Sequence, residues 1–259
     1  MRLERGILIT SVDIDVGNKE LGTINRHKIN RDVNRQFSEY SIGVIEELAL
    51  PMFLNLLERL EIPVTFAIRG QWLEVPNSPL DCLLGSSVNH DIGGHGYYHR
   101  RFSYLSREEA DSEFAKIREA MNNFNLSPTS FIFPTNSIAH LDLLAKYGFK
   151  CYREHGGLLK DGMYIRRHCQ LWDIHPSLYI DRYSNFPVLR KILDLCIRRK
   201  LPFHIWFHLW NFGKTQDQIQ SCLKNLFVPI LRYAKQQAKN GRLAFETMAS
   251  AVHTMETES

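Results

Sequence analysis

Short runs of β-branched and aromatic residues recur along the chain, separated by longer segments whose apolar residues follow a helical spacing. A short apolar run is typical of a buried strand, whereas apolar positions three and four residues apart indicate one buried helix face. The pattern predicts strands over residues 6–12, 63–68, 89–93, 130–133, 149–152, 171–174, 203–207 and 242–245.

Amphipathic helices are predicted between these strands. Pro51 interrupts the first of them, which therefore forms either two helices or one kinked helix. Ser106 and Glu109 form a capping box at the start of another, and Gly148 is a suitable glycine for the end of a third. The predicted helices cover residues 42–60, 106–125, 138–147, 187–199 and 216–238.

Repeated alternation of strand and helix predicts one α/β domain with a parallel sheet, either open or closed into a barrel. No linker rich in Pro, Gly or Ser divides the chain, so we expect one domain over residues 1–255 and a frayed tail over 256–259. The polar stretch 18–38 follows the first strand, where loops of α/β barrels build substrate sites.

Composition narrows the class of protein. Hydrophobic residues make up 44% and charged residues 23% of the chain, as in an ordinary globular protein. The net charge of +4 is scattered, which argues against a nucleic-acid partner but suits an anionic ligand. No window resembles a membrane span. The five cysteines contain no C-x-x-C pair and the N-terminus does not resemble a signal peptide, so we expect buried free thiols and a cytoplasmic protein.

Two carboxylates follow the first predicted strand, in Thr10-Ser11-Val12-Asp13-Ile14-Asp15. In an extended chain Asp13 and Asp15 point to the same side, where one of them would remain protonated near neutral pH unless a cation lies between them. By themselves they fit a functional site and a solvated loop equally well.

Two histidines follow the third predicted strand, in Gly93-Gly94-His95-Gly96-Tyr97-Tyr98-His99. Histidines four residues apart on a helical turn share one face and can bind one metal ion. Such a pair also arises by chance in a chain with eleven histidines. Together with an upstream carboxylate, however, it makes a two-histidine, one-carboxylate ligand set that leaves positions open for water and substrate.

A third group lies in Phe203-His204-Ile205-Trp206-Phe207-His208. On a strand, His204, Trp206 and His208 share one side. His208 ends the run and could donate a proton to a leaving amine. A histidine packed among aromatic rings and hydrogen-bonded to the backbone is an equally good interpretation of this segment alone.

These residues, in this order, resemble the NodB-homology polysaccharide deacetylases, carbohydrate esterase family 4. That family carries Asp-Asp or Asp-x-Asp after its first strand, His-x-x-x-His after its third, and a histidine near its last strands. The resemblance extends through nearly the whole chain. Residues 62–70 are similar to the family's second strand, and residues 131–136, 171–177 and 206–212 to a branch found in capsule and O-antigen gene clusters.

The resemblance implies a single-domain distorted (β/α)7 barrel and one divalent metal. Zinc is the metal expected for this ligand set, and iron, cobalt or nickel would suit the same geometry. The roles implied are Asp13 as catalytic base, Asp15, His95 and His99 as metal ligands, His208 as general acid, and the Thr135 backbone N–H, after Pro134, in the oxyanion hole. Trp206 is a further candidate for substrate contact.

One position departs from the family pattern. The family's third motif usually begins with an arginine that orients the catalytic base, and Ile132 stands there instead. Arg153, at the end of the next predicted strand, is a candidate replacement. An arginine there would otherwise be an ordinary surface or ion-pair residue.

The resemblance implies a hydrolase that removes an N-acetyl or other acyl group from an amino sugar of polysaccharide metabolism. A cytoplasmic location and a mildly positive chain favour a phosphate-bearing precursor as substrate. Exposed apolar helix faces would allow a homo-oligomer. Two alternatives remain open: a ring-opening amidohydrolase that acts on a cyclic imide or ureide, and a degenerate barrel that binds saccharide without cleaving it.

Overall fold

The computed structural model describes residues 3–15, 44–74, 78–153 and 163–257. The polar stretch 18–38 lies outside these described residues, as do the start of the first predicted helix and the last two residues of the chain.

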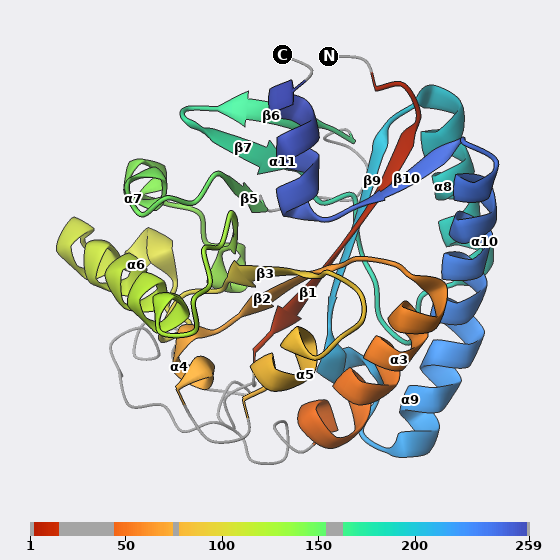
Figure 1. Cartoon of the computed structure of the whole chain (residues 1–259), viewed down its shortest axis with the longest axis horizontal. Coiled ribbons are helices and arrows are strands. Elements are labelled where there is room, and N and C mark those ends of the chain that lie inside the picture. Colours follow the sequence, from red (N-terminus) through yellow and green to blue (C-terminus); the bar gives the residue numbers. More distant parts are fainter. Residues whose placement is uncertain (1–2, 16–43, 75–77, 154–162, 258–259) are drawn as a thin grey trace.

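One ten-stranded sheet forms the centre of the fold, in the order β6-β7-β5-β4-β3-β2-β1-β9-β8, with β10 paired to β1 (Figure 1). Its pairs are parallel except for β6 with β7. The strands are β1 Gly6–Ile14, β2 Thr65–Ile68, β3 Asp91–Gly94, β4 Ser130–Ile132, β5 Cys151–Arg153, β6 Ile165–His168, β7 Leu171–Ile174, β8 Leu178–Tyr179, β9 Pro202–His208 and β10 Leu243–Glu246.

All the strands expected from the hydrophobic pattern are present, with bounds shifted by at most two residues. The pattern missed β6 and β8. Three of the four residues of β6 are exposed and β8 is only two residues long, so neither contains an apolar run.

The sheet curls without closing, because β6 and β8 at its two ends do not pair with each other. β1 lies at the centre and pairs with β9 on one side. On its other side it pairs with β10 over Gly6–Ile9 and with β2 over Ser11–Ile14, so these two strands diverge along it. The expected distorted α/β barrel is therefore confirmed, in the form of a curled half-barrel.

Helices cover the outer face of the sheet. Figure 1 shows α3, α8, α9 and α10 on one side and α4, α6 and α7 on the other. The helices are α3 Leu50–Leu60, α4 Gly70–Leu73, α5 Leu80–Leu84, α6 Arg107–Asn122, α7 Leu141–Lys146, α8 Phe186–Arg199, α9 Gln216–Cys222, α10 Val228–Lys239 and α11 Met248–Thr257. Single π-helical turns, Val44–Ala49 and Leu223–Phe227, precede α3 and α10. Short 3₁₀ turns cover Phe102–Tyr104, Pro134–Asn136 and Leu209–Phe212.

The helix predictions hold with local corrections. Pro51 lies in the first turn of α3, and the π-helical turn runs directly into this helix without a break. The capping box of Ser106 and Glu109 begins α6 as expected. The helix expected over 138–147 begins only at Leu141, because His140 has a left-handed backbone (φ 56°). The short helices α4 and α5 and the final helix α11 were not predicted.

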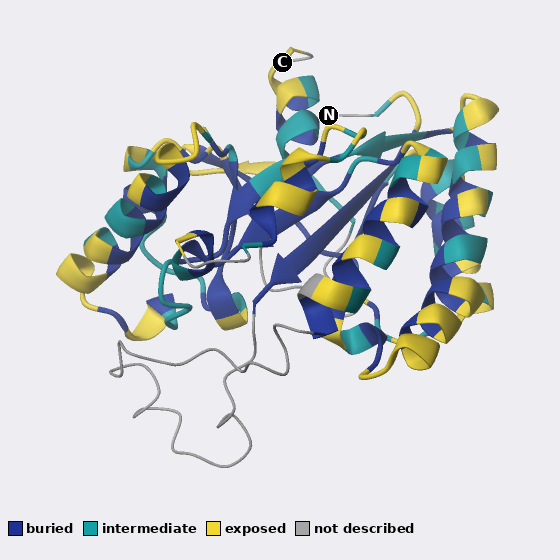
Figure 2. Ribbon diagram, turned by 60° about the horizontal axis from the view of Figure 1, so that its bottom comes forward, coloured by how far each residue is buried: buried dark blue, intermediate teal, exposed yellow. Residues whose placement is uncertain are grey.

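Two separate apolar clusters lie on the two faces of the sheet. The larger one fills the space between the sheet and the outer helices, whose exposed faces point outward in Figure 2. The smaller one fills the inside of the curl and includes Ile7, Ile9, Ile132 and Ile174, together with residues of α11. Along β1, the face that carries Ile7 and Ile9 then carries Ser11 and Asp13. The interior thus changes from apolar at one end of the sheet to polar at the other.

Two further expectations are corrected. Glu256 and Thr257 belong to α11 instead of a frayed tail, and Glu256 pairs with Lys150 and Arg167. All five cysteines are free, but Cys82 and Cys169 are exposed, whereas buried thiols were expected.

In the described part of the chain, no helix has the length and apolar character needed to cross a membrane.

Candidate metal and active site

The candidate residues gather at the carboxyl ends of neighbouring parallel strands. Asp13 lies beside His208 of β9 in the register of β1, and Asp15 follows β1 directly. His95 follows β3, two strands away from β1. Because the strands run parallel, their carboxyl ends meet at one edge, which is where α/β proteins place their ligands.

Asp15, His95 and His99 form a group that could hold a metal ion. One donor atom from each residue lies within 4.8 Å of the others. Nε2 of His99 is 3.1 Å from Oδ2 of Asp15, and the two imidazole rings are 4.9 Å apart between centroids. A second Asp15 oxygen, Oδ1, accepts a hydrogen bond of 3.1 Å from the indole N–H of Trp210. The chain therefore places three mutually close ligands of the types that zinc and similar ions prefer.

The protonation state of His95 suits a metal ligand. Its Nδ1 lies 2.8 Å from the backbone oxygen of Ile132, which can only accept, so Nδ1 carries the proton. Burial lowers the pKa of His95 to about 4, which keeps the ring neutral at pH 7. Its Nε2 therefore presents a lone pair, with the other ring nitrogen held by a backbone carbonyl, as is usual for metal-bound histidines.

Unsatisfied buried atoms support the same assignment. Nε2 of His95 and Nε2 of His99 are both buried without a hydrogen-bond partner among the described residues; the 3.1 Å contact of His99 with Asp15 is an ion-pair distance and not a hydrogen bond. Burial by itself would raise the pKa of Asp15, but the neighbouring His208 and His99 outweigh it, so the pKa lies well below its ordinary value. Two orphaned imidazole nitrogens beside an ionised carboxylate are what a bound divalent cation would satisfy.

The segment that carries the two histidines is a bend, and the expected helical turn is wrong. Gly96 and His99 both have left-handed backbones, with φ of 68° and 59°. The left-handed conformation of Gly96 favours glycine, and a Cβ there would lie 3.0 Å from Cγ of Pro134, so that any side chain would also require Pro134 to shift. The histidines come together because the chain turns twice between them.

This bend is held from two sides by groups outside it. The first backbone N–H groups of α4, from Gly70 and Gln71, donate to the carbonyls of Gly96 and Tyr97 at 2.8 and 3.2 Å. On the other side, the buried carboxylate of Glu113 in α6 accepts the backbone N–H groups of Tyr97 and Tyr98 at 2.9 and 3.1 Å. Glu113 thus replaces the helical hydrogen bonds that the bend lacks.

Replacing Glu113 with Ala is therefore expected to weaken metal binding about 10- to 100-fold, the usual effect of losing a group that orients metal ligands. The Kd for zinc can be measured by competition with a chromophoric chelator. Glu113→Gln is the matched control, because its side-chain oxygen can still accept both N–H groups. Equal zinc affinity in Glu113→Ala and the unaltered protein would show that the bend keeps its shape without this carboxylate.

Asp13 is bound by Arg153. Nη1 and Nη2 of the arginine donate to the two carboxylate oxygens, each at 2.6 Å, and both side chains are buried. Burial would raise the pKa of Asp13, but the charge and hydrogen bonds of Arg153, together with His95 and His208, outweigh it, so the pKa lies below its ordinary value. Arg153 pairs in register with Ile132 on the neighbouring strand. The arginine therefore reaches Asp13 from β5, one strand beyond the position of Ile132 on β4.

His208 faces both carboxylates. Its Nε2 is 3.7 Å from Oδ2 of Asp13 and 3.8 Å from Oδ1 of Asp15. Oδ1 of Asn211 accepts the backbone N–H of His208 at 3.1 Å, so this atom is the amide oxygen. The same oxygen lies 3.2 Å from Nδ1 of the His208 ring. Nδ1 must therefore donate to Asn211, and Nε2 is the nitrogen free for chemistry in the site. The indole of Trp210 packs against the same ring at 4.6 Å.

The remaining predicted residues border this centre. Trp206 stacks under the Arg153 guanidinium at 4.3 Å and contacts the ring of Tyr179. Pro134 is buried below the histidine bend. Thr135 is exposed and has a left-handed backbone (φ 55°), which is unfavourable for a β-branched residue. Its neighbour Asn136 is 3.5 Å from Arg153. Backbone strain of this kind concentrates at functional sites.

Some contributors had been given no role from the sequence. Ser11, Trp210 and Asn211 contact the predicted residues, and His204, placed only on the shared face of β9, joins them through Ser11. Glu113 binds the backbone of Tyr97 and Tyr98, between the two histidines. Strand alternation alone could have placed Ser11 with Asp13. No local pattern indicates that Glu113, on a helix, would reach the histidine bend.

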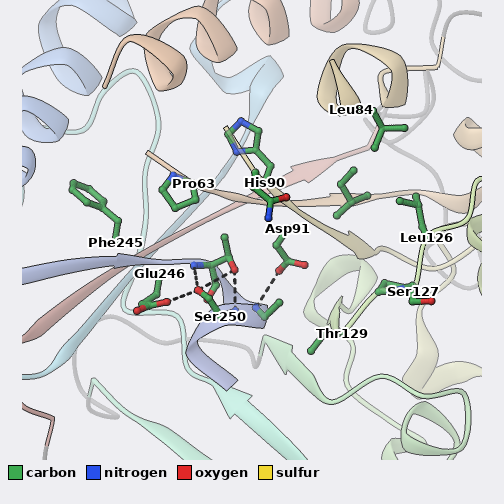
Figure 3. Close-up of a pocket in the computed structure, with 15 residues that line it drawn as sticks. Pro63, Leu84, His90, Asp91, Leu126, Ser127, Thr129, Phe245, Glu246 and Ser250 are labelled. Carbon is green, nitrogen blue, oxygen red and sulfur yellow. Dashed lines mark hydrogen bonds between the residues drawn. The ribbon is translucent and has the colours of Figure 1, made fainter. Parts of the chain in front are cut away.

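A separate cavity of about 650 Å³ lies at the opposite end of the sheet, where β2, β3 and β4 begin (Figure 3). One of its carboxylates is the half-buried Asp91, whose Oδ2 accepts hydrogen bonds from Thr65, Ser130 and the backbone N–H of Ala249. These bonds tie the start of α11 to the strands. These polar groups of the cavity are thus used for structure, and the cavity lies away from His95 and His99.

Comparisons with known proteins agree with this picture. Residues 44–152 match the family model described as polysaccharide deacetylase. No protein with a curated description matches the chain significantly in sequence.

Solved structures match over nearly the whole chain. A Mycobacterium smegmatis protein assigned as a polysaccharide deacetylase is 14% identical, with a TM-score of 0.61 and 93% of each chain covered. A Pseudomonas aeruginosa PAO1 protein with the same assignment is 11% identical (TM-score 0.65), and the PuuE allantoinase is 12% identical (TM-score 0.65). Each of these two alignments covers 94% of this chain and 88% of the other. At such identities the likeness establishes the fold.

Proposed function

We propose that this chain, whose residues 44–152 belong to the polysaccharide deacetylase family, is a metal-dependent hydrolase that removes an acyl group from an amino sugar. The observation that carries the proposal is that a candidate metal site and an ionised candidate base lie together at one edge of the sheet. Asp15, His95 and His99 bring three ligand atoms together, and Asp13 is kept ionised by Arg153 and its other neighbours beside them.

The donor set fits a divalent cation, with zinc as the expected ion. When bound, such an ion supplies Lewis-acid chemistry, which polarises a carbonyl oxygen and lowers the pKa of water. Asp13 is not one of the proposed metal ligands. Arg153 binds both of its carboxylate oxygens and fixes the plane of the carboxylate. Asp13 acts as the general base that accepts the proton of the attacking water.

His208 acts as the general acid. Its Nδ1 is committed to Asn211, so Nε2 delivers the proton to the departing amine. Nε2 lies 3.7 Å from Asp13 and 3.8 Å from Asp15, on the side of the ring that faces the site. The backbone N–H of Thr135 stabilises the oxyanion that forms on the acyl carbon, a contribution typically worth about 3 kcal/mol. Trp206 and Arg153 lie behind Asp13 and shape the wall of the site.

Release of acetate from N-acetylated saccharides tests the proposal. Chitotetraose in its fully N-acetylated form and UDP-N-acetylglucosamine represent a polymer-like and a phosphate-bearing substrate. We expect turnover of one of them. Removing the metal with a chelator should lower it at least about 100-fold, because the ion contributes several kcal/mol of transition-state stabilisation. Added zinc should restore it.

Allantoin and hydantoin serve as competing substrates, since the PuuE allantoinase shares the fold. Ring opening without acetate release would favour a cyclic ureide or imide as the substrate class. A purified protein that holds no metal and turns over none of the four compounds would instead support the degenerate, non-catalytic barrel.

A further inference from the structure

We infer that Ser11 and His204 are positioning residues that hold Arg153 in place against Asp13. The inference rests on the proposed function, in which Asp13 is the catalytic base. Ser11, His204 and Arg153 are all buried, at 0%, 0% and 1% exposure. No substrate can reach the serine or the histidine, so any part they take in catalysis is indirect.

The donor and the acceptor of each hydrogen bond between these residues can be assigned. Nδ1 of His204 lies 3.2 Å from the backbone oxygen of Ile174, which only accepts, so Nδ1 carries the proton. Burial, followed by the charge of Arg153, lowers the pKa of His204 to about 3. The ring is therefore neutral, and Nε2 has only a lone pair to offer.

The hydroxyl of Ser11 completes the chain. It lies 2.8 Å from Nε2 of His204 and must donate to it. Its oxygen then accepts Nη1–H of Arg153 at 3.1 Å. The same Nη1 donates to Asp13 at 2.6 Å. The hydrogen bonds thus lead from the Ile174 carbonyl through His204 of β9, Ser11 of β1 and Arg153 of β5 to the carboxylate of Asp13.

The arginine needs this support because of where it comes from. It stands beside Ile132 in the register of β4 and β5 and crosses the inside of the curl to reach β1. Trp206 contacts one face of the guanidinium at 4.3 Å. Besides Asp13, the guanidinium donates to Ser11 at 3.1 Å and to Asn136 at 3.5 Å. Ser11 is the closer of these two acceptors, and His204 keeps the Ser11 lone pairs turned towards the arginine.

The Ser11–His204 contact could be mistaken for a nucleophile and its base. Two observations oppose that interpretation: neither residue is exposed, and the serine oxygen already accepts from a charged donor, which lowers its nucleophilicity. The serine therefore serves the arginine.

Single and double substitutions test the inference. Ser11→Ala and His204→Leu should each lower kcat about 10- to 100-fold, as expected when a catalytic group loses its alignment. KM and zinc affinity should stay unchanged, since neither residue touches substrate or ligand. Ser11→Thr and His204→Gln keep the hydroxyl and the acceptor and should recover most of the activity. The substrate is whichever N-acetyl saccharide the unaltered protein turns over.

The double variant separates positioning from a general structural effect. If both residues act through one chain, Ser11→Ala with His204→Leu should lower kcat no further than either change alone. Effects that multiply, or two single variants with unchanged kcat, would overturn the inference. Ile205→Val, on the opposite face of β9, is the control for lost core packing and should keep kcat.

A measurement without turnover keeps the inference testable even if the proposed function fails. Nitrogen-15 NMR of the histidine rings should show Nδ1 of His204 protonated and Nε2 bare at neutral pH. Its signal can be assigned by comparison with His204→Gln. In Ser11→Ala, the slowly exchanging guanidinium signal of Arg153 should broaden or vanish. A protonated Nε2, or an unchanged guanidinium signal in Ser11→Ala, would overturn the inference whatever the substrate.

Discussion

Replacing Asp13 with Asn is expected to lower kcat about 10²- to 10⁴-fold, the range that a general base contributes, while the protein still binds zinc. Asn keeps the size of the side chain and one acceptor for Arg153 but cannot take a proton from water. The three metal ligands are untouched. Acetate release and zinc content, measured on the same preparation, check both parts.

This substitution also leaves Arg153 as a buried charge without its partner, which typically costs about 3–5 kcal/mol of stability. Thermal unfolding must therefore be followed, and turnover measured well below the midpoint. Full activity in Asp13→Asn would show that the base is another group. Loss of zinc together with activity would show that Asp13 is itself a ligand.

Replacing Asp15 with Ala is expected to remove metal binding and activity together, with turnover reduced at least about a thousandfold. Asp15 supplies the only carboxylate of the proposed set, and the change also removes the acceptor of the Trp210 indole N–H. Metal analysis after dialysis and acetate release are the two measurements. Asp217→Ala, at an exposed carboxylate in the first turn of α9, is the matched control.

A variant that loses activity but keeps stoichiometric zinc would contradict this expectation and move Asp15 from ligand to catalytic group. The two substitutions together therefore distinguish neighbouring carboxylates with different tasks. Their environments already differ: Arg153 binds both oxygens of Asp13, whereas Asp15 faces two histidines and an indole N–H.

Much of the fold was predictable because the strands buried on both faces are short continuous apolar runs. β1, β2 and β7 are buried along their whole length and are mainly apolar, although β1 also carries Ser11 and Asp13 and β7 carries Asp173. Capping also follows from local chemistry, as Ser106 and Glu109 show. The elements that the pattern missed, β6, β8 and the short helices, owe their existence to their neighbours and carry little periodicity of their own.

The histidine bend shows the limit of reasoning from spacing. A helical turn was expected for His95 and His99, and the structure has two left-handed residues instead. Their conformation depends on Pro134, on the start of α4 and on Glu113, which belong to other parts of the chain. Such contacts leave no trace in the local sequence, so the closeness of the two rings was predicted for the wrong geometric reason.

The sequence by itself determined which groups stand at the ends of strands: alternation along β1 and β9 places Asp13 and His208 on a common side, and parallel order brings His95 to the same edge. Only the tertiary structure decided what each group is bonded to. Arg153 reaches Asp13 across the curl, and Ser11 and His204 accompany it, because curling brings β5 close to β1 although three strands separate them in the sheet. The positions of strands along the chain follow from local pattern, whereas the distance between side chains across the interior depends on the curvature of the whole sheet.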